Sequence, residues 1–416
     1  MEEKKLVPKL RFPGFTEPWE QRKLGEIVER VTRKNNGQSN RPLTISAQDG
    51  LVDQCEYFDR QVASRDMSNY YLIKKGEFAY NKSYSDGYPF GAIKRLDYYD
   101  KGALSTLYII FKIVDDRIGS DFMVAYYMTS LWHKEISKRA AEGARNHGLL
   151  NISTEDFFNS ELKIPNDIKE QIKVGKFVNQ FDQYITLHQR KLEHLKLKKK
   201  SLLQKLFPKE GEVYPELRFP GFTDPWEQRK LGECMNSFAY GLNAAAKGYD
   251  GMHKYIRITD IDDETHNFIQ SNLASPDIDF NMDVSHYKLN VGDIVFARTG
   301  ASVGKTYLYN PNDGDLYYAG FLIRGKVKED CDAGFIYQNT LTKGYDSFIK
   351  ITSQRSGQPG VNSKEYATFR LNIPCKDEQE KISKVLNSLD ELFTLHQRKL
   401  EHLQLLKKAL LQQLFV

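Results

Sequence analysis

Two stretches of the chain repeat apolar residues at alternating steps of four and three, the heptad spacing of helices that pack along a seam. Each stretch interrupts the apolar series with a histidine and a lysine at the same two positions, which we interpret as residues that fix the register. The pattern predicts two long helices, at 166–207 and 375–416, each expected to begin with a capping box, Asp167 with Glu170 and Asp377 with Glu380. The seam positions are Val174, Val178, Phe181, Ile185, His188, Leu192, Leu195, Lys199, Leu202 and Leu206 in the first helix, and Ile382, Leu386, Leu389, Phe393, His396, Leu400, Leu403, Lys407, Leu410 and Leu414 in the second.

The direction of the two predicted helices follows from the connection between them. The first helix ends near Phe207 and the next block opens near Pro215, a gap too short to run back along the helix, since extended chain covers about 3.5 Å per residue. If the two apolar seams bury each other, the second helix must run back along the first. We therefore expect an antiparallel coiled coil, a dumbbell with a pseudo-twofold axis, and a C-terminal segment that returns to the N-terminal block.

The segments outside the helices are expected to be α+β. Residues 107–114 and 292–299 alternate or branch like strands, whereas 122–142 has helical spacing. The two blocks differ in most positions, yet 76–83 resembles 292–299, and each block closes with a loop rich in Arg and Asn, at 144–153 and 354–363. We predict a globular domain at 1–165, a helix at 166–207, a linker with a second globular domain at 208–374, and a helix at 375–416.

The framework around these blocks is written twice. Residues 8–26 (PKLRFPGFTEPWEQRKLGE) recur at 215–233 with two changes, and TLHQRKLEHL occurs unchanged at 186–195 and 394–403. An internal repeat of this kind indicates two units built on one plan.

Composition narrows the class of protein. The 416 residues are 40% hydrophobic and 28% charged, with no apolar run of about 18 residues that could span a bilayer and no export signal at the N-terminus, so we expect a cytoplasmic protein. Four cysteines, Cys55, Cys234, Cys331 and Cys375, have no metal-binding spacing and are interpreted as packing residues. A net charge of +5 is a mild indication of a polyanionic partner and decides nothing alone.

The charge gathers on the predicted helices. Residues 166–207 contain 10 Lys and Arg against 4 Asp and Glu, and the excess centres on Lys196, Lys198, Lys199, Lys200 and Lys205. This cluster is either a solvated helix face or a face turned towards phosphates, and the sequence favours neither.

Catalytic motifs are missing from the sequence. Gly300–Lys305 has three residues between its glycines where a P-loop has four, so we interpret it as a turn that brings backbone and Lys305 close to another group, such as a phosphate. No methyltransferase tetrapeptide, glycine-rich cofactor loop or nuclease motif is present, and the paired histidines of each long helix are six apart, a poor spacing for a metal. We expect no catalytic residue and no metal site.

The doubled layout resembles the specificity (S) subunit of bacterial type I restriction-modification systems. The resemblance rests on the repeated PWEQRKLGE phrase, the variable blocks and the helices with TLHQRKLEHL, and it covers nearly the whole chain. It implies a phage-defence complex in which each block is a target recognition domain reading half of a split site in double-stranded DNA. The helices are then the spacer, two methyltransferase (M) subunits dock on them and methylate adenine, and restriction (R) subunits cut DNA. No cofactor is expected on this chain, whereas S-adenosylmethionine, ATP and Mg belong to the partner subunits.

Base-reading residues are chosen by residue type and loop context, because Arg and Lys can address guanine, and Asn and Gln adenine. The predicted spacer contacts are the central seam residues Ile185, His188, Leu192, Leu195, Lys199, Phe393, His396, Leu400, Leu403 and Lys407. The predicted DNA contacts are Asn81, Lys82, Ser83, Arg145, Asn146 and His147 in the first domain, and Arg298, Thr299, Ser302, Lys305, Arg355, Ser356 and Gln358 in the second.

Two alternative functions stay open. An autonomous DNA-modifying enzyme of unfamiliar design would bind a methyl donor by itself, and a coiled-coil scaffold would show no sequence-selective binding to DNA.

Overall fold

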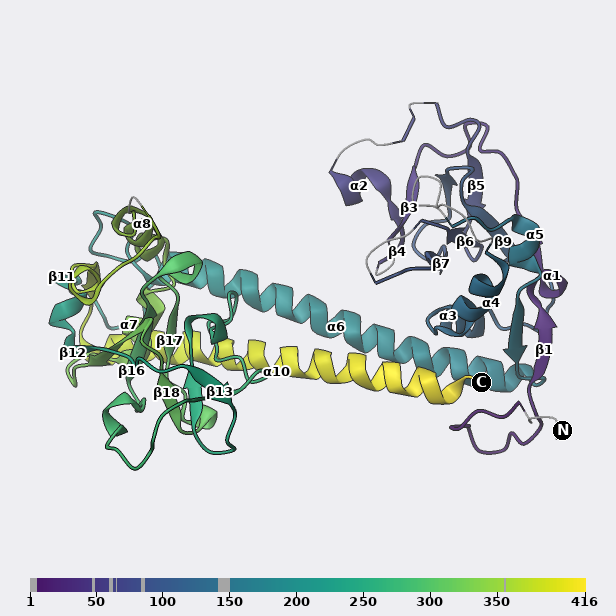
Figure 1. Ribbon diagram of the computed structural model, residues 1–416. Helices are drawn as coiled ribbons and strands as arrows, with labels where there is room; N and C mark the ends of the chain where they lie inside the picture. The colour runs from purple at the N-terminus through teal and green to yellow at the C-terminus, as the bar shows by residue number, and fades with distance from the viewer. Residues whose placement is uncertain are drawn as a thin grey trace. The chain divides into compact units, whose positions relative to one another are not determined.

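The computed structural model describes residues 6–46, 49–59, 63–64, 66–83, 87–140, 150–354 and 357–416. The chain divides into two compact units, Met1–Leu187 with Leu400–Val416, and His188–Lys399. Two 39-residue helices, α6 (Ile168–Leu206) and α10 (Lys376–Leu414), each contribute residues to both units (Figure 1). Each unit therefore contains the start of one long helix and the end of the other.

Within each unit the two long helices run antiparallel. In the first unit Lys407 of α10 forms an ion pair with Asp182 of α6, and the amide of Leu10 donates to the carbonyl of Gln413. In the second unit Lys199 pairs with Asp390 at 2.6 Å, while His188 lies beside His396. Residue numbers rise along one helix as they fall along the other, so the predicted antiparallel pairing is confirmed.

The predicted capping boxes are wrong. Asp167 accepts from the amide of Lys169 at 2.8 Å, and the carboxylate that should close the box, Glu170, binds Arg11 instead. Helix α10 begins at Lys376, so Asp377 lies inside its first turn. The side chains at these helix starts are used for tertiary contacts, which periodicity alone does not reveal.

The first unit is built around a four-stranded antiparallel sheet of order β2-β9-β6-β7, with the two-stranded pairs β3-β4, β5-β8 and β1-β10 beside it. Its strands are β1 (Glu20–Lys23), β2 (Val28–Arg30), β3 (Leu43–Ser46), β4 (Gly50–Asp53), β5 (Tyr71–Lys74), β6 (Phe78–Asn81), β7 (Ala92–Arg95), β8 (Lys101–Leu104), β9 (Ile109–Ile113) and β10 (Glu161–Ile164). Its short helices are α1 (Leu24–Ile27), α2 (Gln54–Phe58), α3 (Ser120–Tyr127), α4 (Leu131–Arg139) and α5 (Thr154–Phe158).

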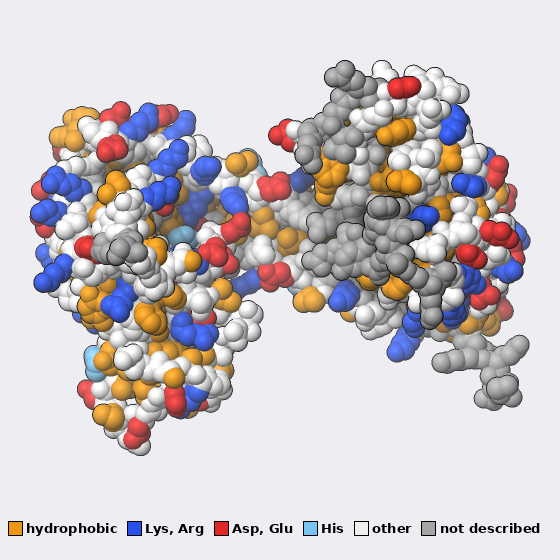
Figure 2. All heavy atoms as spheres, turned by 45° about the horizontal axis from the view of Figure 1, so that its top comes forward, with side chains coloured by type: hydrophobic (Ala, Val, Ile, Leu, Met, Phe, Trp, Pro, Cys, Tyr) orange, Lys and Arg blue, Asp and Glu red, His pale blue; other side chains and the backbone are white. Residues whose placement is uncertain are grey.

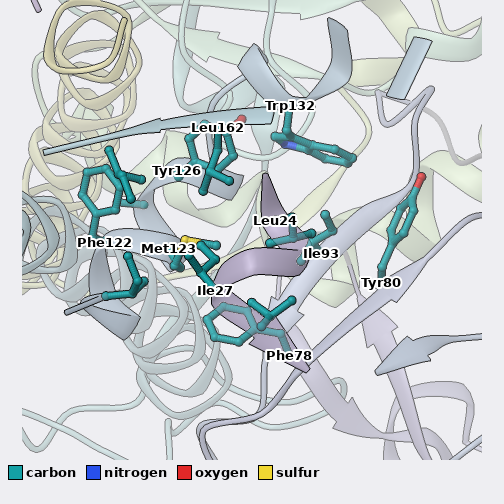
Figure 3. Packing of buried hydrophobic residues seen from close by; sticks show 14 of the residues in the cluster. Leu24, Ile27, Phe78, Tyr80, Ile93, Phe122, Met123, Tyr126, Trp132 and Leu162 are labelled. Atoms are coloured by element: carbon teal, nitrogen blue, oxygen red, sulfur yellow. The ribbon is translucent and has the colours of Figure 1, made fainter. Parts of the chain in front are cut away.

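The main core of this unit lies between the sheet and the helices. Phe78 of β6 and Ile27 of α1 pack with Phe122 and Met123 of α3, all nearly inaccessible to solvent (Figure 3). The end of α10 closes the same core, since Phe415 lies 6.0 Å from the ring of Trp19 and 5.4 Å from that of Phe122. Residues almost 400 positions apart are thus packed in one cluster.

The second unit repeats this arrangement with the sheet order β12-β19-β16-β17 and the pairs β11-β20, β13-β15 and a parallel β14-β18. The strands are β11 (Glu227–Lys230), β12 (Met235–Tyr240), β13 (Ala246–Gly248), β14 (Lys254–Ile256), β15 (Ala274–Pro276), β16 (Asp293–Ala297), β17 (Thr306–Leu308), β18 (Leu316–Tyr318), β19 (Leu322–Val327) and β20 (Arg370–Ile373). The helices are α7 (Ala333–Asn339), α8 (Lys343–Thr352) and α9 (Ser363–Tyr366), with short 3-10 turns at Leu231–Glu233, Ile258–Asp260, Ser285–Tyr287, Gly300–Ser302 and Pro311–Asp313. The predicted α+β class and internal repeat are confirmed.

One predicted helix is broken. The segment 122–142 was expected to be continuous, but α3 ends at Tyr127 and α4 begins at Leu131. The hydroxyl of Thr129 donates to the carbonyl of Tyr126 and accepts from the amide of Leu131, a local alternative to helical hydrogen bonds. The described part of the chain holds no helix apolar and long enough to cross a membrane.

Candidate nucleic-acid interface

The repeated phrase fastens each unit to the start of a long helix. Arg11 contacts Glu170 at 2.7 and 2.8 Å, and Arg218 contacts Glu378 at 2.9 Å through both carboxylate oxygens. The two carboxylates are 2% and 0% exposed. Such two-pronged guanidinium contacts supply a hydrogen bond to each carboxylate oxygen and fix the direction of the carboxylate. We name these two ion pairs the Arg–Glu clasps.

Other side chains of the phrase are used in the same way in both copies. The ammonium of Lys173 lies 4.9 Å from the ring of Phe15, and that of Lys381 lies 4.7 Å from the ring of Phe222. Trp19 and Trp226 are buried, and their amides donate to the carbonyls of Leu6 and Val213. Contacts within each unit therefore explain much of the sequence repeat, in addition to any surface that the repeat presents to partners.

The predicted contacts of the second unit lie where its central strand ends. Arg298 follows β16; its amide donates to the carbonyl of Phe321 at 3.0 Å, and its own carbonyl accepts from the amide of Val361 at 2.9 Å. Its guanidinium lies 5.1 Å from the ring centre of Tyr240, within reach of a cation–π interaction. A hydrogen bond with Ser363 and the charge of Arg298 lower the pKa of Tyr240 against the opposing effect of burial.

The glycine-rich turn at Gly300–Lys305 is occupied by contacts within the protein. Gly304 has a φ of +89°, and a Cβ there would come within 2.7 Å of Ile349, so this position requires glycine. Lys305 forms an ion pair with Asp263 and donates to the carbonyl of Ile261 at 3.4 Å. The group that this turn approaches is a hydrophobic side chain, and the expectation of a phosphate beside it gains no support from these contacts.

The other predicted residues of the second unit flank this turn. Thr299 forms an isolated bridge with Gly360, Ser302 accepts from the amide of Lys305 through its carbonyl, and Gln358 is exposed next to Gly300. Arg355 and Ser356 lie outside the described residues.

The first unit places its predicted contacts at the same point of its own sheet. Asn81 ends β6 and accepts from the amide of Ser83 at 3.0 Å. The ammonium of Lys82 donates to the carbonyl of Ile152 at 3.3 Å, and burial lowers the pKa of Lys82. Arg145, Asn146 and His147 lie outside the described residues.

A shared hydrogen bond shows that the two places are equivalent. The carbonyl of Lys82 accepts from the amide of Leu150 at 3.0 Å, as the carbonyl of Arg298 accepts from Val361. In each unit the end of the central strand is thus tied to the second half of the predicted Arg- and Asn-rich loop. The residues Asn-Lys-Ser of one unit stand where the other has Ala-Arg-Thr.

Sequence reasoning missed Tyr240, Phe321 and Ser363. These residues come from the end of β12, the turn before β19 and the start of α9, and only the folded sheet brings them to Arg298. No motif in the sequence marks any of the three.

Three of the five lysines in the cluster of α6 form ion pairs. Lys196 pairs with Glu264 at 3.0 Å, Lys199 with Asp390 at 2.6 Å and Lys205 with Glu216 at 3.1 Å. A groove of about 1860 Å³ in the second unit is lined by this part of α6, the turn at 300–305 and α8, with side chains of both charges. On the face drawn in Figure 2, Lys and Arg are likewise scattered among Asp and Glu. The three ion pairs favour the interpretation that the lysine cluster is a solvated helix face and not a face turned towards phosphates.

The predicted spacer residues all face inward to some degree. Leu192 and Leu400 are buried, and Ile185, Leu195, Phe393 and Leu403 are half-buried. The Nδ1 atoms of His188 and His396 lie 2.8 Å apart, so one ring must donate and the other accept. No group of three or more metal-ligating side chains occurs among the residues that could be searched.

Comparison with known proteins agrees with this arrangement. Residues 223–405 match the family described as type I restriction modification DNA specificity domain. The MjaX specificity subunit of a type I restriction enzyme from Methanocaldococcus jannaschii is 21% identical over 97% of this chain and 94% of its own length. The MjaVIII specificity subunit of the same organism is 21% identical over 75% of this chain and 73% of its own length.

A solved structure shows the same fold. The S subunit of a type I restriction-modification system from M. genitalium superposes with a TM-score of 0.62 at 14% identity, covering 99% of both chains. Two units of one fold, each clasped to a long helix and carrying different residues at the end of its central strand, define a protein of two duplicated modules. The chain is thus similar, over nearly its whole length, to a specificity subunit of a type I restriction enzyme, and its residues 223–405 match the corresponding DNA specificity domain.

Proposed function

We propose that this chain is the DNA-recognition subunit of a type I restriction-modification complex and reads a split site in double-stranded DNA. The segments 1–165 and 208–374 act as the two target recognition domains, one for each half-site, and 166–207 with 375–416 form the spacer. Modification of adenine and ATP-dependent restriction belong to partner subunits, which hold S-adenosylmethionine, ATP and Mg.

The observation that carries this proposal is that the two units share one framework but differ in the residues at the ends of their central strands. Both units share the sheet order, the Arg–Glu clasp and the hydrogen bond after the central strand. They differ at 81–83 against 297–299, where polar and basic side chains end the strand. A single binding function needs one such module, whereas reading two different half-sites needs two modules that share a frame and differ in the residues that contact bases.

The long helices offer a repeated surface for two identical partner subunits. Exposed apolar side chains recur at a separation of 208 residues: Tyr184 with Leu392, Leu187 with Leu395, and Leu197 with Leu405. Exposed apolar side chains at matching positions of two helices support docking of the same partner twice. We assign these positions to the methyltransferase subunits.

The docking assignment is tested by placing a charge on this surface. Leu187→Glu together with Leu395→Glu should weaken binding of the methyltransferase subunit at least about tenfold, because burying an unpaired carboxylate is costly. Gln189→Glu, an exposed polar position two residues away on α6, is the matched control. Equal affinity of both variants in a pull-down titration would place the docking surface elsewhere.

The recognition function is tested by co-expressing the chain with its methyltransferase subunit in a methylation-free host and mapping modified bases across the genome. One motif of two short defined halves around a fixed gap is the expected result. A complex that forms without producing any motif would favour the scaffold function. Binding of S-adenosylmethionine to the isolated chain in calorimetry would favour an autonomous enzyme.

A further inference from the structure

Each unit carries a large apolar side chain on a turn beside the end of its central strand. In the second unit the turn Ala319–Leu322 is closed by a hydrogen bond of 2.8 Å and holds Phe321, which is 57% exposed. In the first unit the turn Ser105–Tyr108 is closed by a bond of 3.2 Å and holds Leu107, which is 62% exposed. Both are the third residue of their turn, and neither belongs to a hydrophobic core.

Strand register makes the two positions equivalent. Tyr80 of β6 pairs with Ile109 of β9, and Phe296 of β16 pairs with Ile323 of β19. Tyr80 and Phe296 occupy the same place in the matching segments 76–83 and 292–299. Leu107 and Phe321 each lie two residues before the partner of that aromatic residue, so the two folds present them at the same point.

Phe321 lies beside the guanidinium of Arg298. Its ring centre lies 5.9 Å from the guanidinium of Arg298, which the ring of Tyr240 approaches from 5.1 Å. The buried Nε of Arg298 has no hydrogen-bond acceptor among the described residues. Tyr240 is itself 43% exposed, and its hydroxyl lies 3.2 Å from that of Ser363. An exposed apolar tip next to a guanidinium suits a surface that offers both methyl groups and acceptors.

The major groove of DNA is such a surface. Thymine presents a C5 methyl group there, and guanine presents two acceptors that suit a guanidinium. A purely hydrophobic protein partner would leave the cation beside Phe321 uncompensated. The two turns also carry different residues, Phe and Leu, as expected if the units address different half-sites.

We infer that Phe321 and Leu107 are specificity-determining residues, one in each recognition domain, that contact the methyl group of a thymine in the half-site read by that domain. This assignment rests on the proposed function. It adds a hydrophobic contact to the polar contacts predicted from the sequence, and it places that contact outside the Arg- and Asn-rich loops.

The test uses the complex with the methyltransferase subunit and genome-wide mapping of methylated bases. Phe321→Ala should relax one position of one half-site about tenfold and leave the other half-site unchanged. Leu107→Ala should relax the opposite half-site only. Val291→Ala removes another exposed apolar residue of the second unit, 77% exposed and away from the strand end, and should leave the motif unchanged.

A second measurement isolates the methyl group. Replacing single thymines of the site by uracil should weaken binding of the wild-type complex at one position per half-site about tenfold, and Phe321→Ala should abolish this sensitivity in its own half-site. An unchanged motif in both alanine variants, or loss of complex assembly in either, would overturn the inference. A wild-type complex that methylates no split motif would instead refute the proposed function.

Discussion

At the scale of single residues, the Arg–Glu clasps are the contacts that most clearly explain why the segment 8–26 is repeated at 215–233. A carboxylate with no exposed surface is stable only when it is paired and hydrogen-bonded, because desolvation of an isolated charge costs several kcal/mol. Arg218, which lies in the repeated segment 215–233, supplies one hydrogen bond to each carboxylate oxygen of Glu378. The equivalent ion pair between Arg11 and Glu170 in the first unit requires the same two residue types at the matching positions.

We predict that Arg218→Ala lowers the free energy of unfolding of the second unit by about 3 kcal/mol, because it leaves the Glu378 carboxylate buried and unpaired. Urea unfolding combined with hydrogen exchange of the first turns of α10 measures the change. The control is Lys205→Ala, which removes a surface ion pair with Glu216 and should cost less than about 1 kcal/mol. Similar losses in the two variants would contradict the role of the clasp.

The histidine pair makes stability depend on pH. Burial, with the nearby charges of Lys191 and Lys399, lowers the pKa of both His188 and His396 below the ordinary value of 6.5. The unfolded chain therefore binds more protons as the pH falls through about 6.5, and the folded state loses stability there. A doubly protonated pair would also face two donors across 2.8 Å.

We predict that the second unit is less stable at pH 5.5 than at pH 8, and that the double variant His188→Gln with His396→Gln shows a smaller difference. Thermal unfolding at the two pH values measures both. An identical pH dependence in the wild type and the variant would show that other groups control it.

At the scale of elements, the lysines in the seams act through specific acidic partners. Lys407 pairs with Asp182 and Lys199 with Asp390, so each seam lysine is matched by a carboxylate of the opposite helix. A shift of either helix by one turn would separate the charges. The pairs thus specify register, in the way that polar residues do in shorter coiled coils.

Charge reversal tests this. Asp182→Lys should destabilise the first unit by about 1–2 kcal/mol because two ammonium groups then face each other, and adding Lys407→Asp should recover most of the loss. The exposed pair Lys196 and Glu264 is the control, whose single reversals should change stability by less than about 1 kcal/mol. Absence of recovery in the double variant of the seam pair would mean that the lysine contributes by packing alone.

The elements also show how far sequence reasoning reaches. Helices predicted at 166–207 and 375–416 span Ile168–Leu206 and Lys376–Leu414, because a heptad period sustained over more than four heptads has few alternative explanations. The break after Tyr127 and the roles of Glu170 and Glu378 were not predictable, since they depend on a hydroxyl that competes for one carbonyl and on an arginine about 160 residues away. The end of the central strand could be found from the matching segments, but Tyr240 and Phe321 become neighbours of Arg298 only through strand pairing.

At the scale of the whole molecule, each long helix begins in one unit and ends in the core of the other. Phe207 near the end of α6 packs against Trp226 and Phe335 in the second unit, at 6.2 and 5.3 Å between ring centres. Phe415, its counterpart after α10, packs against Trp19 and Phe122 in the first unit. Each unit is completed by the end of the helix that begins in the other.

We predict that Phe415→Ala destabilises the first unit by about 3–5 kcal/mol and leaves the second unchanged, because it opens a cavity beside Trp19. Phe207→Ala should have the converse effect. Hydrogen exchange resolved by segment measures both, with β6 and β16 as reporters. Equal loss of protection in both units of either variant would contradict independent cores.

This exchange of helix ends also determines the order in which the two cores can be completed during synthesis. As the chain leaves the ribosome, Phe207 emerges just before the unit that it completes, whereas Trp19 must wait for residues 411–415 before its core can close. Domains usually fold in the order of their synthesis, but here the unit made first is finished last. Newly made chains that stop short of residue 411 would therefore display an open aromatic core, a form that chaperones and proteases can distinguish from the finished protein.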